Sequence, residues 1–437
     1  MRVAVIGLAA TGLATARALA ARDVEVVLCD SKPEEQLSAE RVAEARAMEN
    51  VSLWLGTTAL PEGIGMLIPS PGVPPTAPPI LEAQARGIEI ASEIEIAYRM
   101  AQAPILAITG TNGKTTTAAM LGAICQVAGK KTFLAGNIAE DHGKRLPLIE
   151  AATQAPKDAV IVAEVSSFQL EWVHDFRPKI AAWLNLSTDH LDRYKDLQEY
   201  GLTKARIFAA QHAGDFAVIN GDDRFVVTMS GGQGRGIRLP FHGGAPQLDP
   251  SLHLHPDELL VPGKHNLANA VAAATMALAF GLSPAKVAEG LRGFPGVAHR
   301  MELVAEKQGV RYFNNSMCTN PAAVAASLSA LTGGVVAIAG GRHKGGDIGP
   351  MVEALATSAR HVVLIGEHGP LLGEALAERG FTSTEQASDM DDAVQRAAAQ
   401  AHTGETVLLV PGFASFDMFT GFEQRGQVFR EAVENLI

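Results

Sequence analysis

The stretch ILAITGTNGKTTT, residues 105–117, joins an apolar run directly to a glycine-containing loop and the start of a helix. Glycines let the backbone turn tightly, so that successive N–H groups point at one anion from the helix N-terminus. In this arrangement a lysine reaches the outer phosphates of a nucleoside triphosphate, and the hydroxyl that follows it binds Mg²⁺. The sequence therefore predicts a nucleotide-binding loop. Its expected contacts are Gly110, Thr111, Asn112, Gly113, Lys114, Thr115 and Thr116.

On both sides of this stretch, short β-branched runs alternate with Ala- and Leu-rich helical runs. That order predicts parallel sheets with helices on both faces. One set of these units precedes the Pro-rich run at residues 68–80, a second begins at Ile105, and a third follows Gly296. We therefore expect an α/β protein of three domains, at about 1–98, 99–298 and 299–437. The first and third should be Rossmann-like, and the middle one should hold a parallel sheet of the P-loop ATPase type.

Composition narrows the class of protein. A chain of 437 residues with 47% hydrophobic and 19% charged residues is expected to fold into two or three packed domains. A net charge of −11 argues against non-specific nucleic-acid binding. Cys29, Cys125 and Cys318 are too few and too scattered for a disulfide framework or a zinc site. No run is long and apolar enough to span a bilayer, so we expect a soluble, cytoplasmic protein.

The glycines of the first strand–helix turn carry a weaker signal. Gly7 and Gly12 frame a GLAATG run in which Ala9 takes the place of the middle glycine of a dinucleotide fingerprint. A methyl group there hinders the close approach of a pyrophosphate. Asp30, at the end of the next strand, could bind a ribose or a base edge. The turn is either a nucleotide site or a plain βα turn, and the pattern argues against NAD.

Further motifs follow the phosphate loop in one order along the chain. They are EVSSFQL (164–170), NLSTDHLDR (185–193), YGLTKARIF (200–208), GKHNLANA (263–270) and the pair His299-Arg300. Each segment alone has an ordinary structural explanation, such as a solvated lysine or a capping histidine. Together, in this order, they resemble the motifs of the Mur ligase family.

The resemblance implies a role for each motif. Glu164 and His190 match magnesium ligands of the family. Thr115 is the magnesium ligand that the phosphate loop itself supplies. Lys204 matches the lysine that carries a carbamate in this family, and the carbamate requires a free amine. We therefore expect cationic surroundings to depress the pKa of Lys204. Asn266 and Asn269 match residues that read the adenine, and Arg300 and Asn315 match positions near the nucleotide. ATP and Mg²⁺ are the implied cofactors.

Within the family, the resemblance is strongest to the branch that adds D-glutamate. This implies an ATP-dependent ligase of peptidoglycan precursor synthesis, which joins UDP-N-acetylmuramoyl-L-alanine to glutamate through an acyl phosphate. We expect a monomer with no nucleic-acid partner and no membrane insertion. Lys344, Thr319, Ser415 and Phe422 match the residues that bind glutamate. The full set of expected substrate contacts is Thr11, Asp30, Ser70, Gly72, Asn137, Thr319, Lys344, Ser415 and Phe422.

One segment departs from the family pattern. The first strand of the third domain normally ends in Asn-Asp-Ser-Lys, whereas this chain has Asn315 in place of the aspartate and Met317 in place of the lysine. One acid and one base are lost together, so the local net charge is unchanged. Arg342 and His343 are candidates to supply the missing positive charge.

Three other functions stay open at this point. A sister ligase could use the same chemistry with a different amino acid or with L-glutamate, as the Asn315 and Met317 departures allow. An oxidoreductase could be built on the first-domain turn, although Ala9 counts against it. A regulatory protein could keep the fold without turnover, although the complete set of expected magnesium ligands counts against that.

Overall fold

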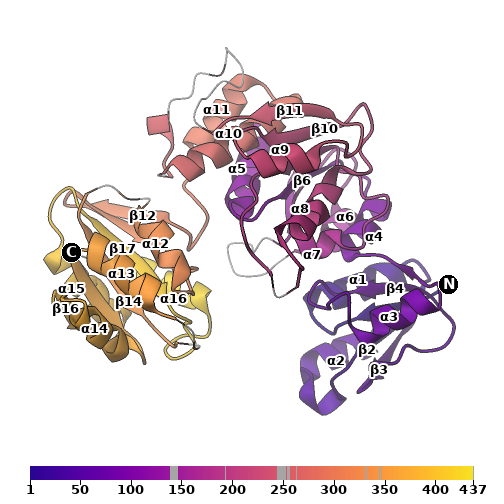
Figure 1. Cartoon of the computed structure of the whole chain (residues 1–437), viewed down its shortest axis with the longest axis horizontal. Helices are drawn as coiled ribbons and strands as arrows, with labels where there is room; N and C mark the ends of the chain where they lie inside the picture. Colours follow the sequence, from indigo (N-terminus) through magenta and orange to yellow (C-terminus); the bar gives the residue numbers. More distant parts are fainter. Residues whose placement is uncertain are drawn as a thin grey trace. The chain divides into compact units, whose positions relative to one another are not determined.

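The computed structural model describes residues 1–137, 146–191, 193–243, 252, 256–261, 263–329, 331, 333–343, 345 and 347–436. Its strands form three sheets, which fall in the three segments expected from the sequence (Figure 1). Contacts group the described residues into two units. One holds the first two sheets, within residues 1–254 and 268–291, and the other holds the third sheet, within 255–267 and 292–436. Boundaries at 98 and 298 stay a prediction.

The first sheet is parallel, with the strand order β3-β2-β1-β4-β5. Val3 and Val5 pack into one core while Ala4 and Ile6 pack into another, so both faces of β1 are buried. This explains why the strand is an unbroken apolar run. The elements are β1 (Arg2–Ile6), α1 (Ala10–Ala20), β2 (Glu25–Asp30), α2 (Ala39–Arg46), β3 (Val51–Leu55), β4 (Ile64–Pro69), α3 (Pro78–Ala85), β5 (Glu89–Ile90) and α4 (Glu93–Met100).

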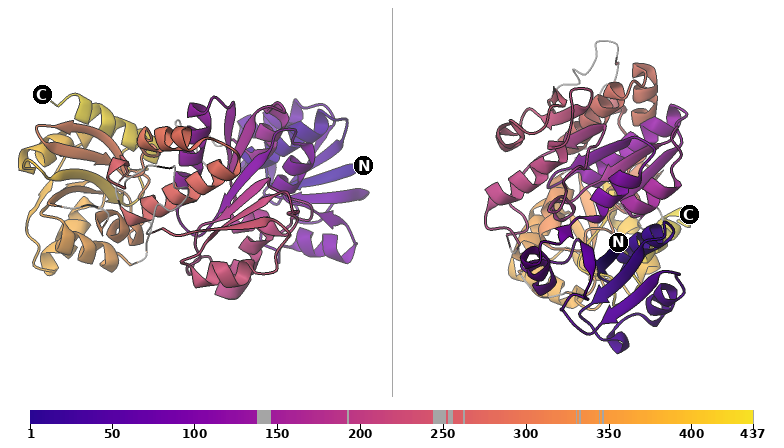
Figure 2. Two further views of the ribbon diagram at one scale, coloured as in Figure 1. Left: turned by 90° about the horizontal axis from the view of Figure 1, so that it is seen from above. Right: turned by 90° about the vertical axis from the view of Figure 1, so that its right-hand side faces the viewer.

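The central sheet is also parallel, with the order β11-β10-β9-β6-β8-β7. Every residue of β6 is buried, and its carboxyl end leads into the phosphate loop. Its strands are β6 (Ile105–Thr109), β7 (Thr132–Gly136), β8 (Val160–Glu164), β9 (Ile180–Trp183), β10 (Phe216–Asn220) and β11 (Ile237–Phe241). Its helices are α5 (Lys114–Val127), α6 (Leu148–Gln154), α7 (Ser167–Leu170), α8 (Leu197–Ala205), α9 (Arg224–Ser230), α10 (Lys264–Ala279) and α11 (Pro284–Arg292). Figure 2 shows the sheets from two further directions.

The third sheet has the order β12-β13-β17-β14-β15-β16 and differs from the expected all-parallel form at one edge. There β12 pairs antiparallel with β13. Gln308 and Gly309 join the two strands, both with positive φ (54° and 75°), the conformation of a tight hairpin turn. The elements are β12 (Glu302–Lys307), β13 (Val310–Asn314), α12 (Ala322–Ser329), β14 (Val335–Gly340), α13 (Gly349–Ser358), β15 (His361–Ile365), α14 (Gly369–Glu378), β16 (Thr384–Gln386), α15 (Met390–Gln400), β17 (Thr406–Gly412) and α16 (Phe422–Glu434).

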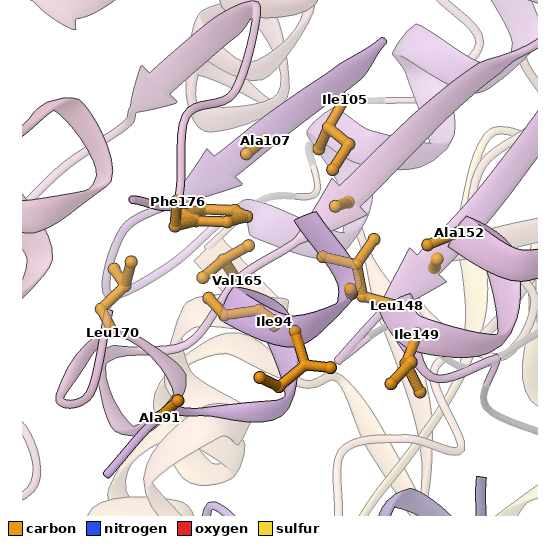
Figure 3. Close-up of a cluster of buried hydrophobic side chains, with 14 of the residues drawn as sticks. Ala91, Ile94, Ile105, Ala107, Leu148, Ile149, Ala152, Val165, Leu170 and Phe176 are labelled. Carbon is orange, nitrogen blue, oxygen red and sulfur yellow. The ribbon is translucent and has the colours of Figure 1, made fainter. Parts of the chain in front are cut away.

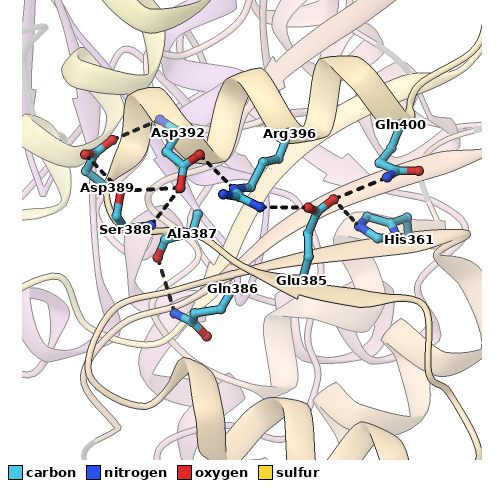
Figure 4. A network of polar contacts seen from close by, with 9 residues as sticks. All are labelled: His361, Glu385, Gln386, Ala387, Ser388, Asp389, Asp392, Arg396 and Gln400. Carbon is cyan, nitrogen blue, oxygen red and sulfur yellow. Dashed lines mark hydrogen bonds and ion pairs between the residues drawn. The ribbon is translucent and has the colours of Figure 1, made fainter.

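A polar network holds the far edge of this third sheet to α15 (Figure 4). The Glu385 carboxylate of β16 forms an ion pair with Arg396 Nη1 at 3.0 Å, and its other oxygen lies 3.0 Å from His361 Nε2. Arg396 is in turn held by Asp392, one helical turn away, at 2.7 Å. A short edge strand bonded by charged side chains is protected against pairing with another chain.

Helix α4 joins the first sheet to the central sheet through a shared core. Ile94 of α4 lies among Ile105, Leu148 and Phe176, which come from the central segment (Figure 3). Glu95 is fully buried, and its carboxylate accepts hydrogen bonds from the backbone N–H groups of residues 174, 175 and 176, at 2.9–3.1 Å. These two sheets therefore form a single packed unit. No helix among the described residues has the length and apolar character needed to cross a membrane.

Glu93, at the start of the same helix, gives a test of this packing. It is 2% exposed, and its Oε1 accepts a hydrogen bond from the Ile149 N–H at 2.6 Å. Its Oε2 has no hydrogen-bond partner among the described residues. Burial raises the pKa of Glu93 to about 7, although hydrogen bonds from Ile149 and Gln169 act in the opposite direction.

We expect the Glu93→Gln variant to gain stability over the wild type as the pH rises from about 4.5 to about 7. In that range the Glu93 carboxyl has lost its proton in the unfolded chain but keeps it in the folded protein, so the free energy of unfolding of the wild type falls as the pH increases. The free energy of unfolding of the variant should exceed that of the wild type by up to about 3 kcal/mol more at pH 8 than below pH 4.5. Urea unfolding of both proteins at pH 5 and pH 8 measures it. A pH-independent difference would show that Glu93 is ionised in the folded protein.

Candidate functional site

The phosphate loop lies between the carboxyl end of β6 and the N-terminus of α5. Gly113 precedes the helix with φ of 82°, and Gly110 has φ of 157°, so both glycines adopt backbone conformations that side chains disfavour. Lys114 folds back over the loop, where its Nζ donates to the carbonyls of Gly110 (3.0 Å) and Thr111 (2.8 Å). The strand, loop and helix expected from the sequence are confirmed.

Residues that follow β9 hold this loop in shape. Asn185 Oδ1 accepts from the Asn112 N–H at 2.8 Å, and Asn185 Nδ2 donates to the Asn112 carbonyl at 3.1 Å. The Thr111 N–H donates to the Asn185 carbonyl at 3.1 Å, and Thr111 Oγ1 accepts from the Ser187 N–H at 3.1 Å. Because β6 and β9 are neighbouring parallel strands, their carboxyl ends meet at this edge.

A carboxylate faces the first turn of α5. Thr115 Oγ1 donates to Glu164 Oε2 at 2.7 Å, and Asn137 Nδ2 donates to Glu164 Oε1 at 3.1 Å. Glu164 ends β8 and is 2% exposed. One carboxylate and one hydroxyl beside a phosphate loop fit Mg²⁺, which usually takes one or two protein oxygens together with phosphate oxygens and waters. Among the described residues no group of three His, Cys, Asp or Glu side chains has an arrangement that could hold a metal ion, so ligands of other types would be needed here.

Lys204, in the last turn of α8, is buried beside the phosphate loop. It is 1% exposed, its Nζ donates to the Gly110 carbonyl at 2.9 Å, and the Tyr200 ring centroid lies 4.6 Å from Nζ. Burial lowers the pKa of Lys204 well below its ordinary value, and the Lys114 ammonium lowers it further. The direction expected from the sequence is confirmed, but the main cause is loss of water rather than cationic surroundings. A lowered pKa favours the free amine, which is the form that reacts with CO₂.

His190 lies in the turn before α8, with a positive φ of 52°. Its ring centroid is 4.7 Å from that of Phe168 and 5.9 Å from that of Tyr200. Asp189 Oδ2 lies 3.5 Å from His190 Nε2. His190 therefore packs in a cluster of aromatic rings, and one of these rings, that of Tyr200, also contacts the Lys204 amine. Its role as a magnesium ligand stays a prediction.

Helix α10 brings Asn269, one of the two expected adenine contacts, to this region. Asn269 lies against the phosphate loop, because a Cβ atom at Gly113 would sit only 2.3 Å from Asn269 Oδ1. This close approach is a second reason for glycine at position 113. Asn266, one turn earlier on the same helix, is 6% exposed. Both asparagines therefore lie at the N-terminal end of α10, and their contact with adenine stays a prediction.

The first domain contains a cavity of about 340 Å³, at the carboxyl ends of β1, β2 and β4. Asp30 and Gly72, two of the expected substrate contacts, line it, and their role stays a prediction. Asp30 Oδ2 also accepts from the Leu8 N–H at 3.1 Å, so the aspartate braces the first βα turn. Ser70 borders a neighbouring small void, with Oγ unpartnered among the described residues. Thr11 lies near the start of α1, where its carbonyl accepts a hydrogen bond from Thr15 Oγ1.

The expected glutamate contacts belong to the third domain. Thr319 is half-buried, Ser415 is buried after β17, and Phe422 begins α16. The Phe422 carbonyl accepts from Ser316 Oγ at 2.7 Å, which ties α16 to the segment after β13. Lys344 lies outside the described residues. The roles of these four residues stay predictions.

Residues 314–317, which depart from the family pattern and are called the departure segment below, form hydrogen bonds and contacts within the third domain. Asn315 is 5% exposed, with Oδ1 accepting from the Met301 N–H (3.2 Å) and Nδ2 donating to Ser327 Oγ (2.8 Å). These contacts give Asn315 a structural role in addition to its expected nucleotide contact. Met317 Sδ lies 3.3 Å from both Nε and Nη2 of Arg300.

Arg342, by contrast, forms an ion pair with Glu367 at 2.9 Å, and its side chain is half exposed. The expectation that Arg342 or His343 replaces the missing lysine therefore has little support from these contacts. The cation that contacts Met317 is Arg300, which the sequence did not suggest for this role.

Two residues of the site had no role assigned from the sequence. Asn185 bonds the phosphate loop through both ends of its amide, and Tyr200 places its ring against the Lys204 amine. Asn185 could have been found, because it follows an apolar strand at the same sheet edge as the loop. Tyr200 lies one helical turn before Lys204, a spacing that brings side chains together but is too common to indicate a function.

Comparisons with known proteins agree along the whole chain. The Mur ligase MurD-like N-terminal domain matches residues 1–92, the Mur ligase middle domain matches 108–277, and the glutamate ligase domain of Mur ligases matches 299–413. The UDP-N-acetylmuramoylalanine–D-glutamate ligase of Pelotomaculum thermopropionicum is 40% identical, over all of this chain and 98% of its own length. The ligases of the same name from Alkaliphilus metalliredigens and Pelobacter propionicus are 38% and 39% identical, over all of this chain and 98% and 99% of their own lengths.

Solved structures show the same fold at lower sequence similarity. MurF from Acinetobacter baumannii is 20% identical with a TM-score of 0.59, over 93% of this chain and 91% of its own. The UDP-N-acetylmuramate–alanine ligase MurC from Thermotoga maritima is 18% identical with a TM-score of 0.56, over 99% of both chains. With Glu164, Asn185 and Lys204 beside one phosphate loop and full-length relatives at about 40% identity, this chain belongs to the Mur ligase family.

Proposed function

We propose that this protein is an ATP-dependent ligase that joins UDP-N-acetylmuramoyl-L-alanine to D-glutamate in peptidoglycan precursor synthesis. The observation that carries the proposal is the group around the phosphate loop, where Thr115, Glu164 and the buried amine of Lys204 come together. Full-length relatives with this activity in their names support the choice of substrates. A cytoplasmic location and a monomeric state stay predictions.

The first step activates the carboxylate of the alanyl substrate. A carboxylate oxygen attacks the γ-phosphorus of ATP, ADP leaves, and an acyl phosphate forms. Two anions react here, so the protein must align them and offset their charge. The Lys114 ammonium, which donates to loop carbonyls in this structure, would bind the outer phosphates instead, and the loop N–H groups would bind them from the helix end. Thr115 would hold one Mg²⁺ at the outer phosphates, and Glu164, His190 and a Lys204 carbamate would hold a second; both ions would neutralise negative charge.

The second step forms the amide bond. The glutamate amine attacks the acyl carbonyl, inorganic phosphate leaves, and the amine loses a proton. Thr319, Lys344, Ser415 and Phe422 of the third domain are the proposed contacts of the amino acid. A ligase for another amino acid or for L-glutamate is the second candidate, because Asn315 and Met317 depart from the family pattern beside this set of residues.

The function is tested by measuring phosphate release with ATP, UDP-N-acetylmuramoyl-L-alanine and a panel of amino acids in both enantiomers. We expect release to depend on the alanyl substrate and to be fastest with D-glutamate. Preference for another amino acid would identify the sister ligase. Phosphate release that does not depend on the alanyl substrate would contradict both candidates.

We expect Lys204→Ala to remove at least about 99% of the ligation rate, since loss of a metal-holding anion costs several kcal/mol of transition-state stabilisation. Added acetate or formate should restore part of the activity by supplying a carboxylate oxygen in the space left by the side chain. Lys204→Met, which leaves less space, should respond less and serves as the matched control. Near-normal turnover of Lys204→Ala would refute the carbamate assignment.

The contact between Met317 and Arg300 leads to a prediction for the departure segment. Met317→Lys places a second cation against the Arg300 guanidinium, where like charges about 4 Å apart repel by roughly 1–4 kcal/mol. We expect the KM for ATP to rise roughly tenfold, which corresponds to about 1.4 kcal/mol. Met317→Leu keeps the position neutral and apolar and should change the KM for ATP less than about threefold, because this swap nearly conserves volume and adds no charge. An unchanged or lower KM for ATP in the lysine variant would show that Arg300 can move away.

A further inference from the structure

Arg193 forms a buried ion pair that fixes the direction of its guanidinium group. Nε and Nη2 donate to the two carboxylate oxygens of Glu171, at 2.8 Å and 2.6 Å, and the two side chains are only 8% and 7% exposed. The guanidinium carbon lies 4.3 Å from the centroid of the Phe168 ring. The Tyr194 hydroxyl donates to the same glutamate at 2.9 Å. Few other orientations of this arginine are therefore available.

A third hydrogen bond leaves this ion pair and reaches the first domain. Arg193 Nη2 donates to the carbonyl of Val73 at 2.8 Å. Val73 closes the turn that begins at Ser70, with its N–H donating to the Ser70 carbonyl at 2.9 Å. Gly72 and Val73 both line the 340 Å³ cavity. A side chain of the central segment therefore holds one wall of a cavity in the first domain.

The same arginine is tied to the phosphate-loop side of the unit. The N–H groups of Arg193 and Tyr194 both donate to the His190 carbonyl at 3.0 Å, so these residues form one tight turn. Phe168, which stacks on Arg193, also contacts the His190 ring. Tyr194 packs against Tyr200, whose ring lies against the Lys204 amine. One continuous set of contacts therefore runs from Val73 to Lys204.

We propose that Arg193 is a positioning residue for the sugar-nucleotide substrate, acting from the central domain on the Ser70–Val73 loop of the first. The proposal rests on the proposed function and takes the first-domain cavity, lined by the expected substrate contacts Asp30 and Gly72, as the site of the nucleotide end of that substrate. Arginine is needed because its planar fork can bind both glutamate oxygens, stack on Phe168 and still reach the Val73 carbonyl. A lysine has one ammonium and cannot make all of these contacts.

The test compares Arg193→Lys with the wild type. We expect the KM for UDP-N-acetylmuramoyl-L-alanine to rise about tenfold, since a charge-assisted hydrogen bond that orders the cavity wall is lost. The KM for ATP should change less than about twofold, because no contact to the phosphate loop itself is removed. Calorimetric titration with UDP alone, without ATP, should show weaker binding. Arg224→Lys is the matched control, since Arg224 also stacks on an aromatic ring, that of Phe225 at 4.9 Å, and should leave both KM values unchanged.

Loss of a buried ion pair could disturb folding, so a second variant removes both charges together. Arg193→Met with Glu171→Gln leaves no unpaired charge, which usually costs little stability. It still lacks the donor to Val73, so its KM for the sugar-nucleotide should also be raised. Thermal unfolding of each variant shows whether the protein remains folded.

Equal changes in the KM for ATP and for the sugar-nucleotide would overturn the positioning role, as would an unchanged UDP affinity in both variants. Wild-type protein that binds UDP but does not consume the alanyl substrate would overturn the proposed function alone, because UDP titration still reports the effect of Arg193 on the cavity. Wild-type protein that does not bind UDP would overturn both.

Discussion

The burial of the Lys204 amine beside the phosphate loop is the constraint on which the central site depends. A charged lysine ammonium at 1% exposure and close to Lys114 would be costly, and the lowered pKa of Lys204 expresses that cost. The protein lowers the cost with the Gly110 carbonyl and the Tyr200 ring. A lowered pKa favours the free amine, which can react with CO₂ to give the anionic carbamate that we propose for Lys204. Near Glu164 and Thr115, that anion would make the pocket suit a divalent ion.

Parallel strand topology explains how these groups meet. The phosphate loop follows β6, Glu164 ends β8 and Asn185 follows β9, and these three strands are adjacent in the sheet. Their carboxyl ends therefore open on one edge, although the residues are far apart in the sequence. The same rule places the first-domain cavity at the ends of β1, β2 and β4. Helix α4 and the Glu95 carboxylate then fix the first sheet on the central one, so the two edges belong to one packed unit.

Much of this arrangement could be predicted from the sequence, because its signals are local. The apolar run before Gly110 and the glycines around Lys114 were enough for the phosphate loop. The antiparallel strand β12 was not predicted, since a six-residue strand at a sheet edge leaves only a weak alternation and its turn depends on Gln308 adopting positive φ. The main cause of the Lys204 pKa shift was also missed. Burial depends on packing between distant elements, whereas neighbouring charges can be inferred from motifs. The contact of Arg300 with Met317 was missed for the same reason.

The hydrogen bonds of the departure segment explain why its acid and its base could change together. Ser327 Oγ donates its only proton to the Ala323 carbonyl at 2.9 Å, so it can only accept from residue 315. Asn315 supplies that donor, whereas an ionised aspartate would set a carboxylate against the serine oxygen in a buried place. Without that acid, a lysine at position 317 would lie against Arg300 with one fewer anion nearby. Methionine removes the repulsion and offers a polarizable surface for the guanidinium. The neutral pair of Asn315 and Met317 is therefore internally consistent, and either change alone would leave an unbalanced charge.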